Sequence, residues 1–451
     1  MNMPAMNSQA MKISVIGCGY LGATHAACMA ELGFDVLGLD LDHDKVAALQ
    51  EARPPFYEPG LEPILRKHVE SGRLRFTTSY DEVAAFGDIH FLCVATPQRD
   101  GELGADLRFV DSAIASLSPR LERPCVVLGK STVPVGTAER LAEDLARMAP
   151  VGRDAVLAWN PEFLREGFAV DDTLRPGRLV FGLPDGYGRE EAENAMRVVY
   201  ADAIAAGTPV VIADLATAQL AKAAANSFLA TKISFINAMA EICEATGGDV
   251  TVLADAIGYD PRIGRQFLNA GLGFGGGCLP KDIRGFMARA GEVGAGDALT
   301  FLREVDAINQ RRRSRVVDVA AELVDRPWPV ANVAVLGAAF KPDSDDIRDS
   351  PALNVAGRIS LFGAHVTVHD PQAIPNARRL WPTLHYADSV MEACRGAHVV
   401  LVLTEWAQFR EIDPVKLAEV VATPAVVDGR NCLDREAWRA AGWTYRALGR
   451  P

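Results

Sequence analysis

The sequence predicts an α/β fold with two parallel-sheet domains joined by a long central helix. Short β-rich runs alternate with alanine-rich stretches before residue 213, and the same alternation returns after residue 330. Between them lies a long run of helix-forming residues. Such alternation is typical of a parallel sheet covered by helices. A chain of 451 residues, 49% of them apolar, is long enough for two or three domains with separate cores.

The first domain is expected over residues 11–212. Its predicted strands are KISVIG, DVLGLD, HFLCVATP, PCVVLGKST, AVLAWNPEF and RLVFGLP. Gly17, Gly19 and Gly22 follow the first strand with GxGxxG spacing. In a Rossmann-like domain, this spacing permits a tight turn and the close approach of a pyrophosphate to a helix N-terminus. A tight turn without a ligand is the alternative.

Asp40 ends the second predicted strand, at the distance from the glycines that a dinucleotide-binding unit requires. A carboxylate at this position accepts hydrogen bonds from a ribose diol and repels a 2′-phosphate. The first domain is therefore expected to bind NAD rather than NADP.

A long helix is predicted over residues 214–245, which contain no glycine or proline. Apolar residues recur along it at spacings of three, four or seven, which predicts a wide apolar side that could be simple core. Lys222 and Asn226 lie one turn apart and share another side. The predicted apolar side contains Leu220, Ala224, Phe228, Phe235, Met239 and Ile242.

The second Rossmann-like domain is expected over residues 330–451, with strands NVAVLGAAF, HVTVHD, HVVLVLTEW and AVVDGRN. Because it lacks GxGxxG, it is expected to hold a nucleotide differently. Lys341, Arg348 and Arg430 are available for phosphate or ribose contacts, although each alone could equally be a solvated surface charge. Residues 213–329 form the central region, and residues 1–10 are expected to be a flexible tail.

Cys278 follows a segment with five glycines, GLGFGGG at residues 271–277. Glycine is favoured where backbone must bend or come close to another group, so a ligand is expected to reach this thiol. Pro280 predicts a helix that starts just after Cys278 and includes Asp282 in its first turn. The helix dipole and Lys281 would lower the thiol pKa below its usual value of about 8.5. The alternative is a small buried residue, as assumed for Cys28, Cys93 and Cys125.

Charge and composition exclude several classes of function. The net charge of −12 argues against nucleic acid or an anionic membrane as a partner. The eight cysteines show no CxxC pair and no zinc spacing, which indicates thiols in a reducing compartment and no metal site. No signal peptide or membrane span is evident, so a cytoplasmic location is expected.

Seven ordered motifs resemble those of the UDP-glucose/GDP-mannose dehydrogenase family, from Met11 to the C-terminus. They are VIGCGYLG, FYEPGLEPIL, KSTVPVGT, NPEFLREG, KAAANSFLATKISFINAMAEIC, GFGGGCLPKD and FKPDSDDIRDSP. The resemblance implies an NAD-binding domain over 11–212, a dimerisation region with a catalytic cysteine over 213–329, and a UDP-sugar-binding domain over 330–451.

The resemblance also implies a four-electron, NAD-dependent oxidation of a nucleotide sugar. UDP-glucose would become UDP-glucuronate through a thiohemiacetal and a thioester on Cys278, an example of nucleophilic catalysis. GDP-mannose is the main rival substrate, and UDP-N-acetylmannosamine is disfavoured because NPEFL is present. A two-electron hydroxyacid dehydrogenase and a non-catalytic NAD-binding sensor are rival functions, and neither requires Cys278.

The family pattern assigns a role to each matching position. Lys222 and Asn226 would stabilise developing negative charge, Asp282 with Thr132 would handle water, and Glu162 and Glu166 would support hydrolysis, although from sequence alone both glutamates read as solvated. Cofactor contacts are expected from Gly17, Gly19, Tyr20, Leu21, Gly22, Asp40, Lys45, Thr96, Thr132, Glu166, Cys278, Lys281 and Arg348. Substrate contacts are expected from Glu162, Phe163, Leu164, Lys222, Asn226, Arg262, Phe267, Phe274, Gly275, Lys341 and Arg430.

The same resemblance predicts a homodimer through the central helix, with Arg262 reaching the neighbouring subunit's substrate. The chain departs from the family pattern at two positions. Gly277 replaces a serine that usually precedes the cysteine, and Gln219 stands where a glutamate is common.

Overall fold

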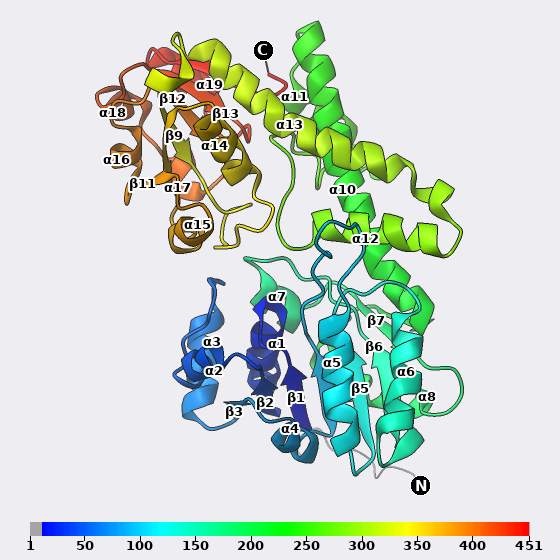
Figure 1. Ribbon diagram of the computed structural model, residues 1–451. Helices are drawn as coiled ribbons and strands as arrows, with labels where there is room; N and C mark the ends of the chain where they lie inside the picture. The colour runs from blue at the N-terminus through cyan, green and yellow to red at the C-terminus, as the bar shows by residue number, and fades with distance from the viewer. Residues whose placement is uncertain (1–10, 451) are drawn as a thin grey trace. The chain divides into compact units, whose positions relative to one another are not determined.

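The computed structural model describes residues 11–450, so the predicted tail at residues 1–10 lies outside the described residues. The chain divides into two compact units (Figure 1). The first unit contains residues up to 225 together with 284–289, and the second contains residues 226–283 and those from 290 onward. The boundaries of the three expected domains remain predictions.

The first unit is built on an eight-stranded sheet with the order β3-β2-β1-β4-β5-β6-β7-β8. Most of its strands are continuous apolar runs because helices cover both faces of the sheet. The strands are β1 (Lys12–Ile16), β2 (Asp35–Leu39), β3 (Leu74–Thr77), β4 (Ile89–Leu92), β5 (Cys125–Gly129), β6 (Ala155–Trp159), β7 (Leu179–Leu183) and β8 (Val210–Asp214).

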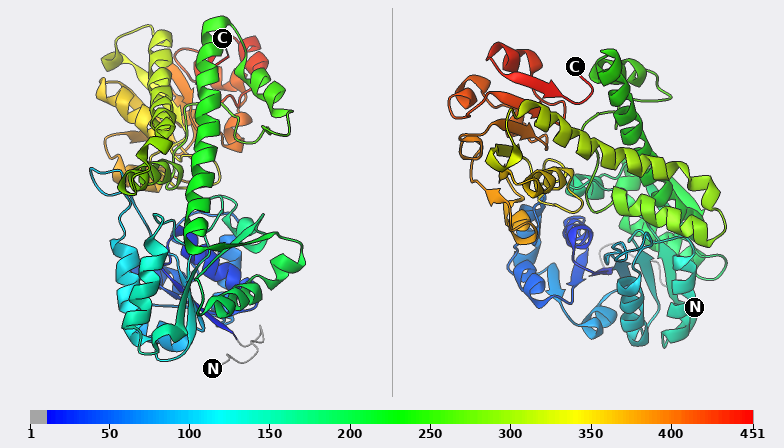
Figure 2. Two further views of the ribbon diagram at one scale, coloured as in Figure 1. Left: turned by 90° about the vertical axis from the view of Figure 1, so that its right-hand side faces the viewer. Right: turned by 45° about the horizontal axis from the view of Figure 1, so that its top comes forward.

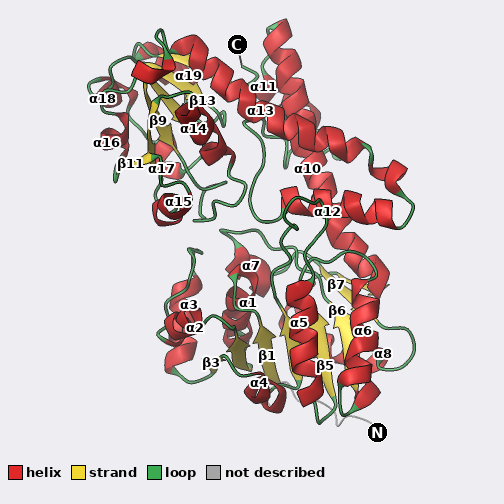
Figure 3. Ribbon diagram, viewed as in Figure 1, coloured by secondary structure: helices red, strands yellow, loops and turns green. Residues whose placement is uncertain are grey.

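Two apolar cores lie on the two faces of this sheet. Helices α1, α3 and α8 supply one core, and α4, α5 and α6 supply the other. Figure 3 shows the helices flanking the strands. The helices are α1 (Tyr20–Glu31), α2 (His43–Gln50), α3 (Leu61–Glu70), α4 (Tyr80–Phe86), α5 (Arg108–Leu117), α6 (Thr137–Met148), α7 (Ala169–Leu174), α8 (Arg189–Val199) and α9 (Ala201–Ala205).

One strand pair departs from the predicted parallel arrangement. β6 and β7 pair in the antiparallel sense, Trp159 with Gly182, whereas the other pairs in this sheet are parallel. A parallel connection needs a helical crossover that returns the chain to its starting edge. The segment after β6 contains only the short α7, so the chain reverses direction instead.

The second unit contains a six-stranded parallel sheet with the order β11-β10-β9-β12-β13-β14. Its strands are β9 (Asn332–Leu336), β10 (His365–His369), β11 (His385–Tyr386), β12 (Val399–Val402), β13 (Ala425–Asp428) and β14 (Thr444–Ala447). Its helices are α11 (Val250–Gly258), α13 (Phe301–Leu323), α14 (Pro351–Leu361), α15 (Ile374–Leu380), α16 (Val390–Cys394), α17 (Ala407–Arg410), α18 (Pro414–Ala418) and α19 (Arg435–Ala440).

The long predicted helix is confirmed as α10 (Leu215–Thr246), which is continuous over its length (Figure 2). The interpretation of its apolar side as simple core is wrong. Phe228, Phe235 and Ile242 are 66%, 49% and 54% exposed, whereas Asn237 and Ser234 are fully or almost fully buried. The helix therefore buries polar side chains together with Ile236 and Ala240, while these three large apolar residues of the predicted side are exposed.

Candidate active site

The three glycines after β1 occupy three different environments. Gly17 has φ +90°, and a Cβ on it would lie 2.9 Å from Val94 Cα. A Cβ on Gly22 would lie 1.8 Å from the Gly17 carbonyl oxygen, so the helix packs on the turn only without a side chain. At Gly19 no described atom beyond the adjoining residues lies within 4 Å of such a Cβ. The turn thus leaves open space in front of α1, which fits the pyrophosphate of a dinucleotide.

Asp40 follows β2 beside this turn. Its Oδ2 accepts hydrogen bonds from the Cys18 backbone N–H and from Lys45 Nζ, both at 2.9 Å. The side chains of Asp40 and Lys45 are 13% and 27% exposed. The carboxylate is fixed at the position expected for a ribose contact, and Lys45 is held against it.

Tyr20 opens α1 and is anchored by Glu58, a residue with no predicted role. The Tyr20 hydroxyl donates to the buried Glu58, whose two oxygens also accept from the backbone N–H groups of Gly167 and Ala169 at 2.7 Å. Burial, with the nearby carboxylates of Glu166 and Glu58, raises the pKa of Tyr20. Glu58 therefore joins the start of α1, next to the glycine turn, to the NPEFLREG loop. In the sequence, only its place in the motif FYEPG could have indicated a role for Glu58.

The loops after β4 and β5 meet through two predicted cofactor residues. Thr96 is buried, and its Oγ1 donates to the Thr132 carbonyl oxygen at 2.8 Å. Leu21 lies half-buried in the first turn of α1. Together with the glycine turn and Asp40, these residues lie at the carboxyl ends of β1, β2, β4 and β5, where open α/β sheets bind ligands.

Glu162 and Glu166 are not solvated, contrary to the reading from sequence alone. Glu166 is buried, and the side chain of Glu162 is only 11% exposed. Glu162 forms an ion pair with Lys222 of α10 at 2.9 Å and accepts from the Leu164 N–H at 2.7 Å. Lys222 also lies 5.6 Å from the centre of the Phe163 ring. The structure therefore gathers Glu162, Phe163 and Leu164 around one buried cation.

Cys278 lies immediately before α12 (Leu279–Glu292), as predicted, and its side chain is exposed. The Asp282 N–H donates to the Cys278 carbonyl at 3.0 Å, which is the first backbone bond of this helix. The other seven cysteines are buried or half-buried. Burial raises the pKa of Cys93, Cys125 and Cys394 to about 12. Among the described cysteines, Cys278 therefore differs from these three in its access to solvent.

Asp282 is a buried carboxylate held from two sides. Asn226 Nδ2 donates to its Oδ2 at 2.6 Å, and Lys281 Nζ pairs with its Oδ1 at 2.5 Å. Its side chain is 2% exposed. The second unit thus assembles an amide, a carboxylate and an ammonium group at the first turn of the helix that follows Cys278.

The glycines before Cys278 are required by packing that the sequence does not reveal. Added Cβ atoms would meet protein atoms, not open space, at 2.4 Å for Gly273, 2.3 Å for Gly275 and 2.2 Å for Gly277. The neighbours are Asn309 Oδ1, the Asp349 carbonyl and Arg348 Cζ respectively. Close packing within the second unit therefore explains why positions 273 and 275 carry no side chain. At position 277 the neighbour is the end of the exposed Arg348 side chain, which a serine side chain would displace.

Arg430 is not a solvated charge. Its guanidinium donates to the backbone carbonyls of Leu403, Gly273 and Phe340 at 2.9 to 3.2 Å, and it is 13% exposed. Lys341 is half-buried beside Phe340. Arg348 pairs in a bidentate manner with Asp346 and is 57% exposed. Arg430 and Arg348 thus contact the loop that carries Phe274 and Gly275, at Gly273 and Gly277 respectively.

Arg262 and Phe267 lie in the segment between α11 and the glycine-rich loop. Arg262 is 88% exposed and pairs with its neighbour Asp260. Phe267 is 36% exposed and has φ +64°, an uncommon conformation for a bulky residue that is often found at functional sites. Exposure of Arg262 is what its predicted contact with a neighbouring subunit requires.

Comparison with known proteins identifies the family. Its NAD-binding domain matches residues 11–204, its central domain residues 216–311 and its UDP-binding domain residues 334–435. The chain belongs to the UDP-glucose/GDP-mannose dehydrogenase family. It carries that family's NAD-binding domain, and the glycine turn and Asp40 fit this cofactor.

Relatives match over almost the whole chain. UDP-glucose 6-dehydrogenase of Rhizobium meliloti (strain 1021) is 38% identical over 98% of this chain and 100% of its own. The Pseudomonas aeruginosa enzyme of the same name is 40% identical over 98% of both chains. The structure of a UDP-glucose dehydrogenase from Pyrobaculum islandicum superposes with a TM-score of 0.89 at 35% identity, covering 99% of this chain and 100% of that one.

Within residues 11–450, no helix is long and apolar enough to span a membrane. The same residues contain no group of three or more His, Cys, Asp or Glu arranged to hold a metal ion.

Proposed function

We propose that this protein oxidises UDP-glucose to UDP-glucuronate as an NAD-dependent dehydrogenase, with covalent intermediates on Cys278. The exposed Cys278, one helical turn before Asp282 and its partners Asn226 and Lys281, carries the proposal. Relatives named UDP-glucose 6-dehydrogenase, matched over almost their entire lengths, support the choice of substrate. A hydroxyacid dehydrogenase or an NAD-binding sensor would need no such thiol.

The proposed chemistry proceeds in four steps, namely oxidation, addition of the thiol, a second oxidation and hydrolysis. The C6 alcohol loses a hydride and a proton to give an aldehyde, and the Cys278 thiol adds to its carbonyl carbon. The thiohemiacetal loses a second hydride and proton to give a thioester, which water hydrolyses to the carboxylate and the thiol. When bound, NAD accepts the hydride in each oxidation. Two NAD are therefore consumed for each sugar.

Charged side chains of this chain support those steps. Lys222 and Asn226 stabilise the oxygen on which negative charge develops, a task for preorganised donors. Asp282, with Thr132, accepts a proton and positions water. Glu162, which is paired with Lys222, and Glu166 assist hydrolysis of the thioester. Lys341, Arg430 and the Phe274 segment bind the UDP portion.

We also propose a homodimer through α10. Phe228, Phe235 and Ile242 are exposed on that helix, and Val252 of α11 is 65% exposed. Exposed apolar groups of this size mark protein interfaces. Phe235→Glu is expected to convert the dimer to a monomer in sedimentation equilibrium, and an unchanged mass would exclude this helix as the interface.

A panel of nucleotide sugars tests the proposed function directly. UDP-glucose, GDP-mannose and UDP-N-acetylmannosamine are each incubated with enzyme and NAD, and NADH formation is followed by absorbance. The highest kcat/KM is expected for UDP-glucose. Preference for another sugar would overturn the substrate assignment, and absence of NADH with every sugar would overturn the reaction.

A further inference from the structure

The loop that carries Phe274 and leads to Cys278 is fixed by side chains of α13. Asn309 and Arg313 lie one turn apart on this helix, and they are 0% and 2% exposed. Neither residue carries a role in the proposed chemistry. Both direct polar atoms at the same backbone segment.

Asn309 pairs with both backbone groups of Phe274. Its Oδ1 accepts from the Phe274 N–H at 2.7 Å, and its Nδ2 donates to the Phe274 carbonyl at 3.0 Å. The amide thus bonds the loop as a neighbouring strand would. The close approach of Gly273 to Asn309 Oδ1 makes this contact possible only with glycine at position 273.

Arg313 holds the same carbonyl and ties it to a second loop. One guanidinium nitrogen donates to the Phe274 carbonyl at 3.1 Å, and the other pairs with Asp349 Oδ1 at 2.8 Å. The Asp349 carbonyl in turn packs where Gly275 lacks a side chain. Arg313 therefore links the residues before Cys278 to the segment before α14.

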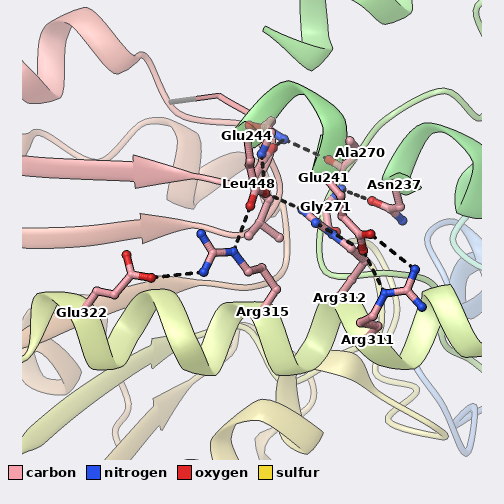
Figure 4. A network of polar contacts seen from close by, with 12 residues as sticks. Asn237, Glu241, Glu244, Ala270, Gly271, Arg311, Arg312, Arg315, Glu322 and Leu448 are labelled. Atoms are coloured by element: carbon pink, nitrogen blue, oxygen red, sulfur yellow. Dashed lines mark hydrogen bonds and ion pairs between the residues drawn. The ribbon is translucent and has the colours of Figure 1, made fainter. Parts of the chain in front are cut away.

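The beginning of the loop is held by a separate set of contacts. Figure 4 shows Gly271 between Asn237 of α10 and Arg312 of α13. Asn237 Oδ1 accepts from the Gly271 N–H at 2.8 Å, while Arg312 pairs with Glu244 at 3.0 Å. Within the described residues, the ion pairs of Arg315 go to Glu244 and Glu322 rather than to the loop.

A purely stabilising role does not explain buried polar residues at these positions. Burying an arginine carries a large desolvation cost, and well-packed apolar residues often stabilise a core as much or more. A buried hydrogen-bonded network instead selects one arrangement of the groups it contacts. At Asn309 and Arg313, the arrangement selected is that of the Phe274 backbone.

We propose that Asn309 and Arg313 are positioning residues that fix Phe274 and thereby place the Cys278 thiol for attack on the aldehyde. The inference rests on the proposed function, because it needs Cys278 to be the nucleophile. A reacting atom displaced by about 1 Å can cost about a hundredfold in rate. Loss of these contacts is expected to slow capture of the aldehyde more than it weakens substrate binding.

The test uses the full-length enzyme and the variants Asn309→Leu and Arg313→Met, with Arg315→Met as the matched control on the same helix. Asn309→Asp and Arg313→Lys serve if either first variant fails to fold. Each protein is assayed for kcat and KM with UDP-glucose, and for aldehyde that can be trapped by hydroxylamine. Hydrogen exchange of residues 271–282 reports on the loop without requiring turnover.

We expect the Asn309 and Arg313 variants to lower kcat by about ten- to a hundredfold and to raise KM by a smaller factor, because the Phe274 segment also binds the substrate. They should also release trappable aldehyde and exchange the loop amides faster, while the Arg315 variant matches wild type. Folded variants with wild-type kcat and no released aldehyde would overturn the inference. Wild-type enzyme without turnover of UDP-glucose would instead overturn the proposed function.

Discussion

Each sheet places an aspartate after its second strand, Asp40 after β2 and Asp370 after β10. Asp40 accepts one backbone N–H from the turn after β1, and it also accepts from Lys45 and from the Asp42 N–H. Asp370 accepts from the Trp406 indole and from four backbone N–H groups, and it is 2% exposed. Those four groups belong to Ala338, Ala339, Gln372 and Ala373.

The helices that follow the first strand of each sheet also differ, in how their N-termini are capped. α1 starts directly at the glycine turn, and no side chain among the described residues caps its N-terminus. α14 starts only at Pro351, and Ser350 accepts from the Leu353 N–H there. Within the described part of the chain, the first unit thus leaves the N-terminus of α1 without a side-chain cap, whereas the second unit caps α14 with Ser350 and surrounds Asp370 with its own loop.

A shared local fold therefore does not imply a shared ligand site. In the second unit, the segment between β9 and α14 packs against the glycines at 275, 276 and 277 through Asp349, Phe340 and Arg348. Its chemistry is therefore expected in the loop that carries Cys278, and cofactor binding is expected in the first unit.

Cys278→Ser has the largest expected effect, because it tests whether the chemistry depends on Cys278 while cofactor binding does not. It should lower the rate of complete oxidation by about a thousandfold or more, because the serine hydroxyl is a far weaker nucleophile. The dissociation constant for NAD should stay within about twofold of wild type, as measured by fluorescence titration. Cys432→Ser is the control. Undiminished formation of UDP-glucuronate by the Cys278 variant would refute the mechanism.

Asp370→Asn tests whether the hydrogen bonds that Asp370 accepts stabilise the second unit. An amide group facing several N–H donors loses some of their hydrogen bonds, so the free energy of unfolding should fall by about 3 kcal/mol in urea titrations. NAD affinity of the folded protein should not change. A stability equal to wild type would show that the Asp370 contacts contribute little.

Asp40→Ala tests whether Asp40 contributes to NAD binding, and it has the smallest expected effect of the three variants. NAD binding should weaken about tenfold, and the preference for NAD over NADP should decrease. Asp35→Ala, at the other end of β2, is the matched control because its side chain is exposed there. Equal affinities of wild type and the Asp40 variant for both cofactors would remove Asp40 from the ribose site.

The features of the fold that were predictable depend on local patterns. The apolar strands β1, β2, β9 and β10 and the uninterrupted α10 were found because burial on both faces or a long helical run leaves a clear signal. The edge strands β3, β8, β11 and β14 were missed. β3, β11 and β14 are short and contain polar residues, and β8 is a short apolar run that sequence alone does not separate from the start of α10.

The candidate site was predictable only in part. The position of Cys278 at the start of α12 followed from Pro280, but the enclosure of Glu162 depends on Lys222 from a distant segment. The packing reason for the glycines before Cys278 likewise lies in Asn309 and Asp349. Contacts between residues far apart in the chain leave no periodic pattern, and a single sequence does not reveal them.

In the proposed mechanism, Cys278 becomes covalently bonded to the sugar during turnover. Rapid quenching of wild-type enzyme with UDP-glucose and NAD, followed by proteolysis and mass spectrometry, measures this directly. A transient mass increase equal to the oxidised nucleotide sugar is expected on the peptide that contains residues 271–282. Formation of UDP-glucuronate with that peptide unmodified at every time point would contradict this mechanism.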